Sequence, residues 1–222
     1  MRAEDRVHDG RDQRPTAAVV DSSSVTSTPV PGERGFDGAK KADGIKRHIL
    51  VDTAGRLLTA HVTAANVQAT AAFADLVTKN PCPSVAHVWA DKGYTGQAPA
   101  DAATAAGIEP EIASGPQPVG GFVVQPRRWV VERTNGWINR HRRLVRQHEA
   151  TLTAHEAFVI LSQIRLLKRR LDHHESLFDR LEGGLAHTRP PSGGREPSSM
   201  RANGANHPEE SAKYRASQWP PT

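Results

Sequence analysis

Short apolar runs, each interrupted by glycine, proline or serine, dominate the first half of the chain. Runs of this length between turn-forming residues are typical of buried β-strands. Two of them are separated only by Ala54, Gly55 and Arg56, which form a tight turn, so they predict a hairpin. We therefore expect strands at 17–21, 48–53, 57–62 and 86–91, and a short fifth strand at 108–112.

Helical periodicity appears between these strands and throughout the second half. Asn66 suits the N-cap of an amphipathic helix, and an alanine-rich helix follows Gly96. Residues 127–146 place Val130, Trp137, Ile138, Leu144 and Val145 on one side of a basic helix. The pattern Thr153-Ala154-His155-Glu156 is that of a capping box, which predicts a helix from 153 to about 181. Its expected apolar side comprises Ala157, Phe158, Ile160, Leu161, Ile164, Leu167 and Leu171.

The order of these elements predicts an α/β fold, with a mixed sheet flanked by helices. Residues 1–16 are polar and lack periodicity, so we interpret them as a lead-in or linker before a domain at 17–181. Residues 182–222 contain mostly glycine, proline, serine and mixed charge. They hold too few apolar side chains to bury, and we expect a disordered C-terminal tail.

Composition narrows the class of protein. The 222 residues carry a formal net charge of +5, and the arginines are clustered, which favours a polyanionic partner such as nucleic acid. A single cysteine, Cys82, excludes an internal disulfide and a multi-cysteine zinc site. The chain has no apolar run long enough to span a membrane, and residues 1–10 lack the apolar core of a signal peptide. We expect a cytoplasmic, nucleoid-associated protein.

Three carboxylates are candidates for a catalytic, metal-binding site. Asp21 and Asp91 each end a predicted strand, and Glu132 lies among the arginines of the basic helix. Two of them have a simpler explanation: Asp21 could cap a turn over the serines that follow it, and Glu132 could merely pair with Arg128. If strand ends and helix converge, the three carboxylates suit Mg²⁺ or Mn²⁺, and two such ions support phosphodiester chemistry.

Basic residues in two regions, and Lys92 after the strand at 86–91, are candidates for binding the DNA backbone. One region is the glycine- and lysine-rich stretch 32–48, which a solvated loop would explain equally well. The other is the basic helix. The candidates are Lys40, Lys46, Arg47, Lys92, Arg128, Arg133, Arg140, Arg143 and Arg146.

Six segments together resemble, in order, the catalytic domain of DDE transposases of the insertion sequence 5 family. They are 20–25, 35–41, 46–48, 51–55, 90–94 and 127–134, and the resemblance covers roughly residues 17–171. It implies a ribonuclease-H-like fold and the catalytic, metal-binding triad Asp21, Asp91 and Glu132. It also implies Mg²⁺-dependent nicking at transposon ends, attack of the freed 3′-hydroxyl on target DNA, and self-association in a DNA complex.

The chain departs from this family in two respects. In the tyrosine–arginine–glutamate–lysine signature of the wider group, Arg128 and Glu132 match, whereas Gln125 and Asn139 replace the tyrosine and the lysine; Arg140 stands beside the latter. Members usually carry a further N-terminal region, which we expect this chain to lack. Two other hypotheses therefore stay open: an inactive remnant that only binds DNA, and a ribonuclease-H-like nuclease that cuts without joining.

Overall fold

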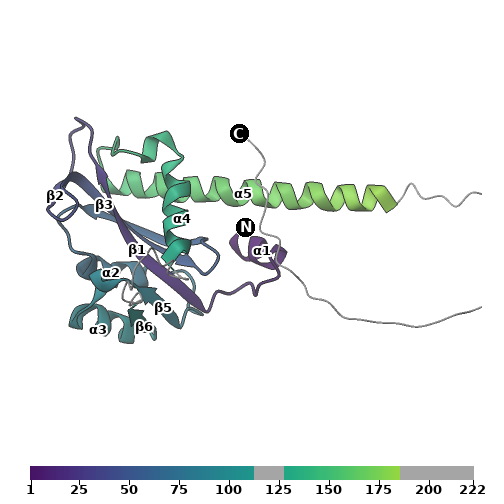
Figure 1. The fold of residues 1–222 in the computed structure, drawn as a ribbon, viewed down its shortest axis with the longest axis horizontal. Helices are drawn as coiled ribbons and strands as arrows, with labels where there is room; N and C mark the ends of the chain where they lie inside the picture. Colours follow the sequence, from purple (N-terminus) through teal and green to yellow (C-terminus); the bar gives the residue numbers. More distant parts are fainter. Residues whose placement is uncertain (113–127, 186–222) are drawn as a thin grey trace, which may run out of the picture.

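The computed structural model describes residues 1–112 and 128–185, with side chains described as far as 112 and from 129 to 174. Figure 1 shows one curved sheet with helices packed on it and the long helix α5 extending past its edge. The strands are β1 (Ala17–Thr26), β2 (Gly35–Asp37), β3 (Ala42–Asp52), β4 (Leu57–Ala64), β5 (His87–Ala90) and β6 (Glu109–Ile112). The helices are α1 (Arg2–His8), α2 (Ala69–Thr78), α3 (Gln97–Ala105), α4 (Arg128–Asn139) and α5 (Leu152–Leu185), with short 3₁₀ turns η1 (Lys92–Tyr94) and η2 (Arg142–Leu144).

The sheet is mixed, with β1 at its centre. On one side, β1 pairs antiparallel with β3, which in turn pairs antiparallel with β4 and with the short β2. On the other side, β5 runs parallel to β1, and β6 runs parallel to β5. The expected fold class, a ribonuclease-H-like α/β fold with a mixed sheet flanked by helices, is confirmed by this arrangement.

Two strands are longer than predicted. β1 continues through the three serines to Thr26, so the turn that Asp21 was suggested to cap does not exist. β3 begins at Ala42, inside the stretch interpreted as a glycine- and lysine-rich loop. The two extensions pair with each other, from Ser23 opposite Arg47 to Thr26 opposite Gly44. Gly44 permits this close pairing, because a Cβ atom there would lie 2.0 Å from the carbonyl oxygen of Val25.

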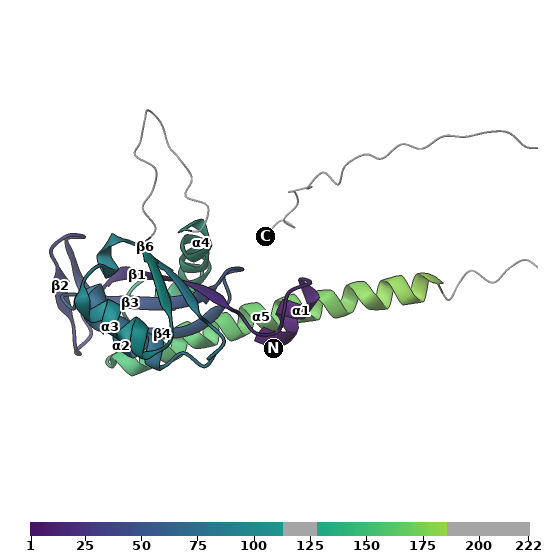
Figure 2. The same ribbon diagram turned by 90° about the horizontal axis from the view of Figure 1, so that it is seen from below.

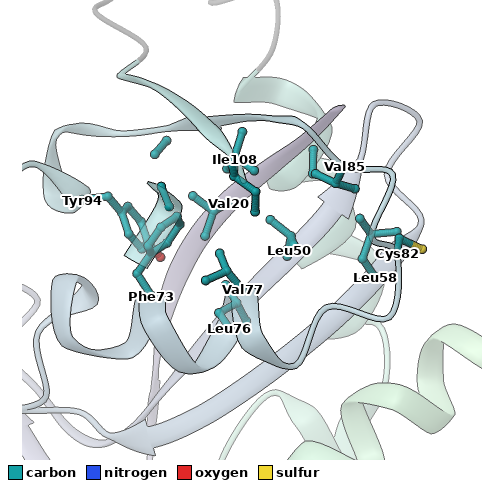
Figure 3. Packing of buried hydrophobic residues seen from close by; sticks show 14 residues of the cluster. Val20, Leu50, Leu58, Phe73, Leu76, Val77, Cys82, Val85, Tyr94 and Ile108 are labelled. Atoms are coloured by element: carbon teal, nitrogen blue, oxygen red, sulfur yellow. The ribbon is translucent and has the colours of Figure 1, made fainter. Parts of the chain in front are cut away.

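Alternating residues of β1 divide the apolar core between the two faces of the sheet. Val20 belongs to a cluster with Leu50, Phe73 and Leu76, which is covered by α2 and α3 (Figure 3). Val19 belongs to a second cluster that includes residues of α4 and α5. Because successive side chains of a strand point to opposite faces, Asp21 lies on the same face as Val19, beside α4.

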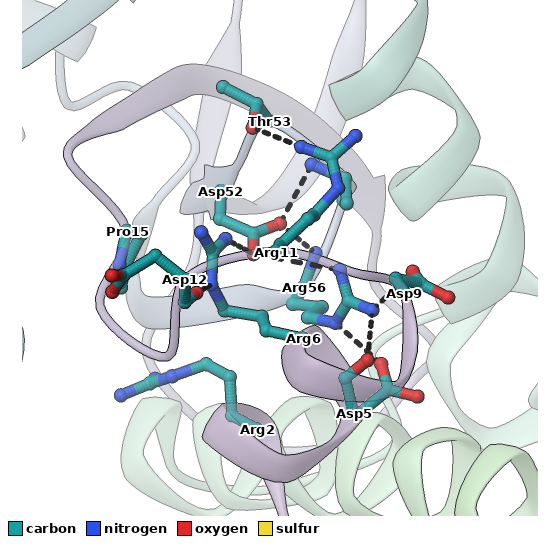
Figure 4. Close-up of polar contacts among 12 residues, drawn as sticks. Arg2, Asp5, Arg6, Asp9, Arg11, Asp12, Pro15, Asp52, Thr53 and Arg56 are labelled. Carbon is teal, nitrogen blue, oxygen red and sulfur yellow. Dashed lines mark hydrogen bonds and ion pairs between the residues drawn. The ribbon is translucent and has the colours of Figure 1, made fainter.

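Residues 1–16 are not the frayed lead-in that their composition predicted. Residues 2–8 form α1, which packs beside α5 (Figures 1 and 2) and buries Asp5 and Arg6. Arg6 pairs with Asp52 at 2.5 Å, and Asp5 pairs with Arg56 at 2.5 Å (Figure 4). Docking through ion pairs leaves no apolar pattern in the sequence, which explains the error.

The basic stretch forms two elements rather than one helix. α4 ends at Asn139, and η2 follows after a break. Val130, Trp137, Ile138 and Leu144 are buried as predicted, whereas Val145 lies beyond η2 and is 53% exposed.

The start and the buried side of α5 also differ from the prediction. The cap is Thr151, whose hydroxyl accepts a hydrogen bond from the amide of Ala154, while Glu156 accepts one from the amide of Val62. The predicted capping box is therefore wrong. The face against the sheet carries Val159, Leu167 and Leu171 together with His155, Ser162 and Gln163, whereas Ile160, Leu161 and Ile164 are exposed.

The C-terminal boundary moves as well, since α5 continues from 181 to Leu185. The rest of the expected tail, 186–222, and the loop at 114–121 lie outside the described residues, so the predicted disorder of the tail stays a prediction. Within the described parts, no helix combines the length and apolar character needed to cross a membrane.

Candidate active site

Asp21 and Asp91 occupy corresponding positions relative to two neighbouring parallel strands, β1 and β5. β1 and β5 run parallel, with Ala17 opposite His87 and Val19 opposite Trp89. Asp21 comes two residues after Val19, and Asp91 comes two residues after Trp89. Val19 and Trp89 both pack in the cluster on the α4 side. Side chains two residues apart on a strand share a face. The two carboxylates therefore lie just past the paired part of β1 and β5, on the face that α4 covers: Asp21 is inside β1, and Asp91 comes directly after the end of β5.

Asp21 has a partner that was not among the predicted site residues. The side-chain amide of Asn135, on α4, donates a hydrogen bond to Asp21 Oδ2 at 3.0 Å. The other polar atom of the same side chain, Asn135 Oδ1, is buried and has no hydrogen-bond partner. Asn135 thus fixes the Asp21 carboxylate through its amide nitrogen. Its amide oxygen accepts no hydrogen bond, and an oxygen of this type is a suitable ligand for Mg²⁺ or Ca²⁺. In the sequence, its only signal is its position three residues after Glu132.

Asp91 is held by the turn that follows β5. Its Oδ1 accepts a hydrogen bond from the amide of Gly93 at 2.9 Å and so caps η1. Tyr94, in the same turn, is buried below. Burial, and then the negative charges of Asp21 and Asp91, raise the pKa of the Tyr94 hydroxyl far above its usual range. Both carboxylates therefore act on one hydroxyl, which is consistent with their positions on β1 and directly after the adjacent strand β5.

Glu132 is exposed on α4, three residues before Asn135. Side chains at this spacing lie on the same side of a helix, with Cβ atoms about 5–6 Å apart. However, nowhere in the described residues do three histidine, cysteine, aspartate or glutamate side chains come together as a metal-binding group. The assignment of Asp21, Asp91 and Glu132 as one triad thus stays a prediction.

The oxygen atoms that are gathered here nevertheless suit a hard divalent cation. Asp21 and Asp91 supply carboxylates on one face of the sheet, and Asn135 brings an unpaired amide oxygen to the same place. Ligands of this kind favour Mg²⁺ or Mn²⁺ over metals that prefer sulfur or imidazole. Glu132 would supply a third carboxylate from one helical turn away.

Two of the residues predicted to contact DNA have partners within the fold, and one of them, Arg47, is too buried to reach DNA. The Arg47 side chain is buried, with 1% of the residue exposed, and it donates to Leu144 O at 3.1 Å and to Asn139 Oδ1 at 2.8 Å. It joins β3 to the end of α4 and to η2. Lys46 pairs with Asp37 at 3.3 Å and donates to Val67 O at 3.0 Å. Both side chains were expected in a solvated loop, but they lie in β3 and stabilise the fold.

The remaining predicted contacts differ in their availability. Arg143 is exposed and pairs with Glu149 at 2.5 Å, with its guanidinium 4.7 Å from the Phe158 ring. Arg133 is half-buried. The side chain of Arg128 lies outside the described residues. Exposed positions are occupied by Lys40, Lys92, Arg140 and Arg146.

A basic hollow beside η2 adds two residues that were not predicted. Arg142 and His148 line it together with Arg143, and its volume is about 430 Å³. Arg142 belongs to the same run of basic residues as Arg140 and Arg143, and this clustering was the available signal. The hollow extends the positively charged surface beyond the end of α4.

Comparison with known proteins identifies the family. The family described as Transposase DDE domain matches residues 12–167, which is more than half of the chain. A protein from Burkholderia cepacia, assigned as a transposase for insertion sequence element IS402, is 33% identical over 142 residues, covering 60% of this chain and 66% of that protein. The chain therefore spans slightly less than two thirds of that relative's length.

Among solved structures, the catalytic core domain of BIV integrase is similar over 67% of this chain and 81% of that one. Its sequence identity is 14% and its TM-score 0.39, so the likeness adds nothing to the fold that the strand order itself shows. The family match rests on the sequence. It includes the strands that carry Asp21 and Asp91 and the helix that carries Glu132. The chain belongs to the transposase DDE domain family.

Proposed function

We propose that this chain is the catalytic domain of an insertion-sequence-5-type transposase, which cleaves DNA at transposon ends and joins the freed 3′-hydroxyl to target DNA. The observation that carries the proposal is the placement of Asp21, inside β1, and Asp91, directly after the adjacent parallel strand β5, on the sheet face covered by the helix with Glu132. Membership of the transposase DDE domain family supports the same reaction class.

In this proposal Asp21, Asp91 and Glu132 hold Mg²⁺ or Mn²⁺. Two such ions, when bound, activate the attacking oxygen of a phosphodiester exchange and stabilise the leaving one. The protein contributes the geometry. Asn135 fixes the Asp21 carboxylate through its amide, and the turn amide of Gly93 fixes Asp91. Lys92, exposed beside Asp91, is placed to attract a phosphate of the substrate strand.

DNA is the proposed partner, and a second copy of the chain is proposed to join it in the complex. Exposed Arg140, Arg142, Arg143 and Arg146 extend from the end of α4 and would contact the phosphate backbone without reading its sequence. We place this activity in the cytoplasm, at the nucleoid.

One observation favours a second candidate function, a remnant that binds DNA without cutting it. The described residues hold no preassembled group of three metal-binding side chains. In this case, the basic surface around η2 would retain DNA binding while Glu132 failed to complete the site.

A nicking assay separates these functions. The chain is incubated with supercoiled plasmid that carries a candidate transposon end, with Mg²⁺, with Mn²⁺ or with chelator. Nicks that require metal and are absent with Asp91→Asn support the enzyme, whereas DNA binding without nicking identifies the remnant. Joined products distinguish a transposase from a nuclease that only cuts.

A further inference from the structure

A dense ion network contains none of the three carboxylates of the proposed active site. It forms where α1, the β3–β4 turn, α4 and α5 meet (Figure 4). Arg56 is its centre, with Asp5 and Asp9 at 2.5 Å and Asp52 at 3.8 Å. Five arginines and three aspartates take part, which leaves two positive charges in excess: Arg6, Arg11, Arg56, Arg133 and Arg170 with Asp5, Asp9 and Asp52.

The three aspartates form most of their ion pairs with two inner arginines, Arg6 and Arg56. Arg56 contacts all three, and Arg6 takes Asp52 at 2.5 Å. The outer arginines have weaker partners: Arg11 donates to Thr53 Oγ1 at 3.1 Å and Arg133 to Ala54 O at 2.8 Å. Arg170 reaches Asp5 only at 3.3 Å. The excess charge therefore resides on Arg11, Arg133 and Arg170.

These three outer arginines line one cavity of about 400 Å³. Asp5 and Asp9, both already paired with Arg56, also line it, together with Thr53, Ala54, Trp129 and His174. The Nε atom of Arg133 is buried without a hydrogen-bond acceptor. A buried donor left without an acceptor costs free energy, which a ligand with acceptor oxygens would recover. Burial, followed by the charges of Arg170 and Arg56, lowers the pKa of Arg133, so its surroundings are positive on balance.

Aromatic rings hold two of the three guanidinium groups in place. The Arg133 guanidinium lies 4.3 Å from the centre of the Trp129 ring and 4.7 Å from that of the Trp137 ring. The Arg170 guanidinium also lies 4.7 Å from the centre of the Trp137 ring. This alternation of rings and cations joins α4 to α5. Gly55 allows the turn to approach it, because a Cβ atom there would lie 2.9 Å from Thr134 Oγ1, and its φ is +83°. The donors are thus fixed before any ligand arrives.

We propose that this cavity binds a phosphate group through Arg11, Arg133 and Arg170. Planar guanidinium groups match the oxygens of a phosphate, and a dianion offsets the two excess charges. The phosphate can belong to a DNA backbone or be free inorganic phosphate. Arg133 alone was expected to contact DNA. The two further arginines come from outside the sequence motif: Arg11 from the segment after α1, and Arg170 from α5. The proposal does not depend on metal-dependent cleavage.

The first test is thermal melting with inorganic phosphate, against sodium chloride of matched ionic strength. The parent should show a saturable rise in melting temperature, because a ligand that binds only the folded state stabilises it by mass action. Arg11→Ala should lose most of the rise. Arg14→Ala should keep it, since Arg14 is an exposed arginine three residues away with no place in the cavity. No rise in the parent, or equal rises in both variants, would overturn the proposal.

A second pair of variants guards against loss of folding. Arg170→Gln is compared with Arg169→Gln, which removes a neighbouring exposed arginine of α5. Both must retain the parent's circular dichroism spectrum and cooperative melting. Loss of the phosphate response in Arg170→Gln alone supports the site, and its retention there opposes it.

The source of the phosphate is decided with duplex DNA. If a backbone phosphate occupies the cavity, Arg11→Ala should reduce the log–log salt slope of DNA binding by about 0.9. If the slope is unchanged while the response to inorganic phosphate is lost, the ligand is free phosphate. Either result supports the cavity. Neither requires nicking activity, so the proposed reaction can fail independently.

Discussion

Asn135 donates a hydrogen bond to Asp21 at 3.0 Å, which joins α4 to the central strand across 114 positions of sequence. A neutral side chain therefore occupies the position facing the carboxylate that we propose to be catalytic. With its amide nitrogen engaged and Oδ1 unpaired, Asn135 is suited to position Asp21 and to contact a cation. Two predictions follow from exchanging its side chain.

Asn135→Ala removes the bond and should lower the free energy of unfolding by about 1 kcal/mol. Asn135→Asp places a second carboxylate against Asp21 and should melt lower still without metal, because the like charges repel. Mn²⁺ should then restore more stability to Asn135→Asp than to the parent. Melting curves with and without Mn²⁺ measure both effects. An equal metal response in all three proteins would remove Asn135 from the site.

Asp91→Asn should abolish most of the stabilisation by Mn²⁺ if Asp91 holds the cation. The parent should gain stability in proportion to the logarithm of metal concentration above saturation. Asp101→Asn is the matched control, since Asp101 is exposed on α3 and bonds only Gln97. Differential scanning fluorimetry over a range of Mn²⁺ concentrations makes the comparison. Metal responses that are the same in both variants would place the ion elsewhere.

The arginines of the basic surface should differ in how strongly their removal reduces the salt slope of DNA binding. Arg143 was expected to reduce the salt slope when removed, but Glu149 partly neutralises it at 2.5 Å. Arg146→Ala should therefore reduce the slope by about 0.9, as for a full phosphate contact, and Arg143→Ala by less. Glu149→Gln should tighten DNA binding. Fluorescence anisotropy between low and moderate salt measures the slopes; a larger effect for Arg143→Ala would contradict the ranking.

Stability should fall as the pH drops below about 6.5, partly because of His155. Burial, and next the charge of Arg47, lower the pKa of His155 to about 4, and neither ring nitrogen has a hydrogen-bond partner. The unfolded chain takes up the proton first, near its ordinary pKa of about 6.5. Stability from the neutral ring is thus present above that pH and is lost progressively down to about 4, by up to about 2 kcal/mol at pH 5.

His155→Leu should reduce the difference in melting temperature between pH 7 and pH 5. His173→Gln, at an exposed position of the same helix, should leave that difference unchanged. Some pH dependence will remain in His155→Leu, because burial and then the charge of His61 also lower the pKa of His48, to about 3. An unaltered difference in His155→Leu would exclude His155 as a cause.

The fold was predictable where apolar residues alternate or cluster. The strands around Val19 and Val88 were found because burial leaves a pattern in the sequence. The extension of β1 through Ser22–Ser24 was not, since it depends on pairing with β3 rather than on local propensity. α1 was missed for a related reason: its buried side chains are charged, and their partners lie some fifty residues away.

For the site, strand ends allowed Asp21 and Asp91 to be placed side by side. The error over Arg47 arose because a guanidinium in a basic stretch gives no sign of burial; only the acceptors on Asn139 and Leu144 reveal its role. The contribution of Asn135 could not be inferred without the crossing of α4 over β1. Whether Glu132 joins the two aspartates is decided by experiment.

The crossing of α4 over the central strand also has a consequence for the order of folding. β1 and β3 are close in sequence, whereas the contact between Asn135 and Asp21 closes a loop of 114 residues. Entropy favours closing the short loop first, so the antiparallel half of the sheet should form before the helix docks. Until then Asp21 stands without its amide partner. A chain emerging from the ribosome would therefore hold its scaffold early and acquire the geometry of the proposed metal site last.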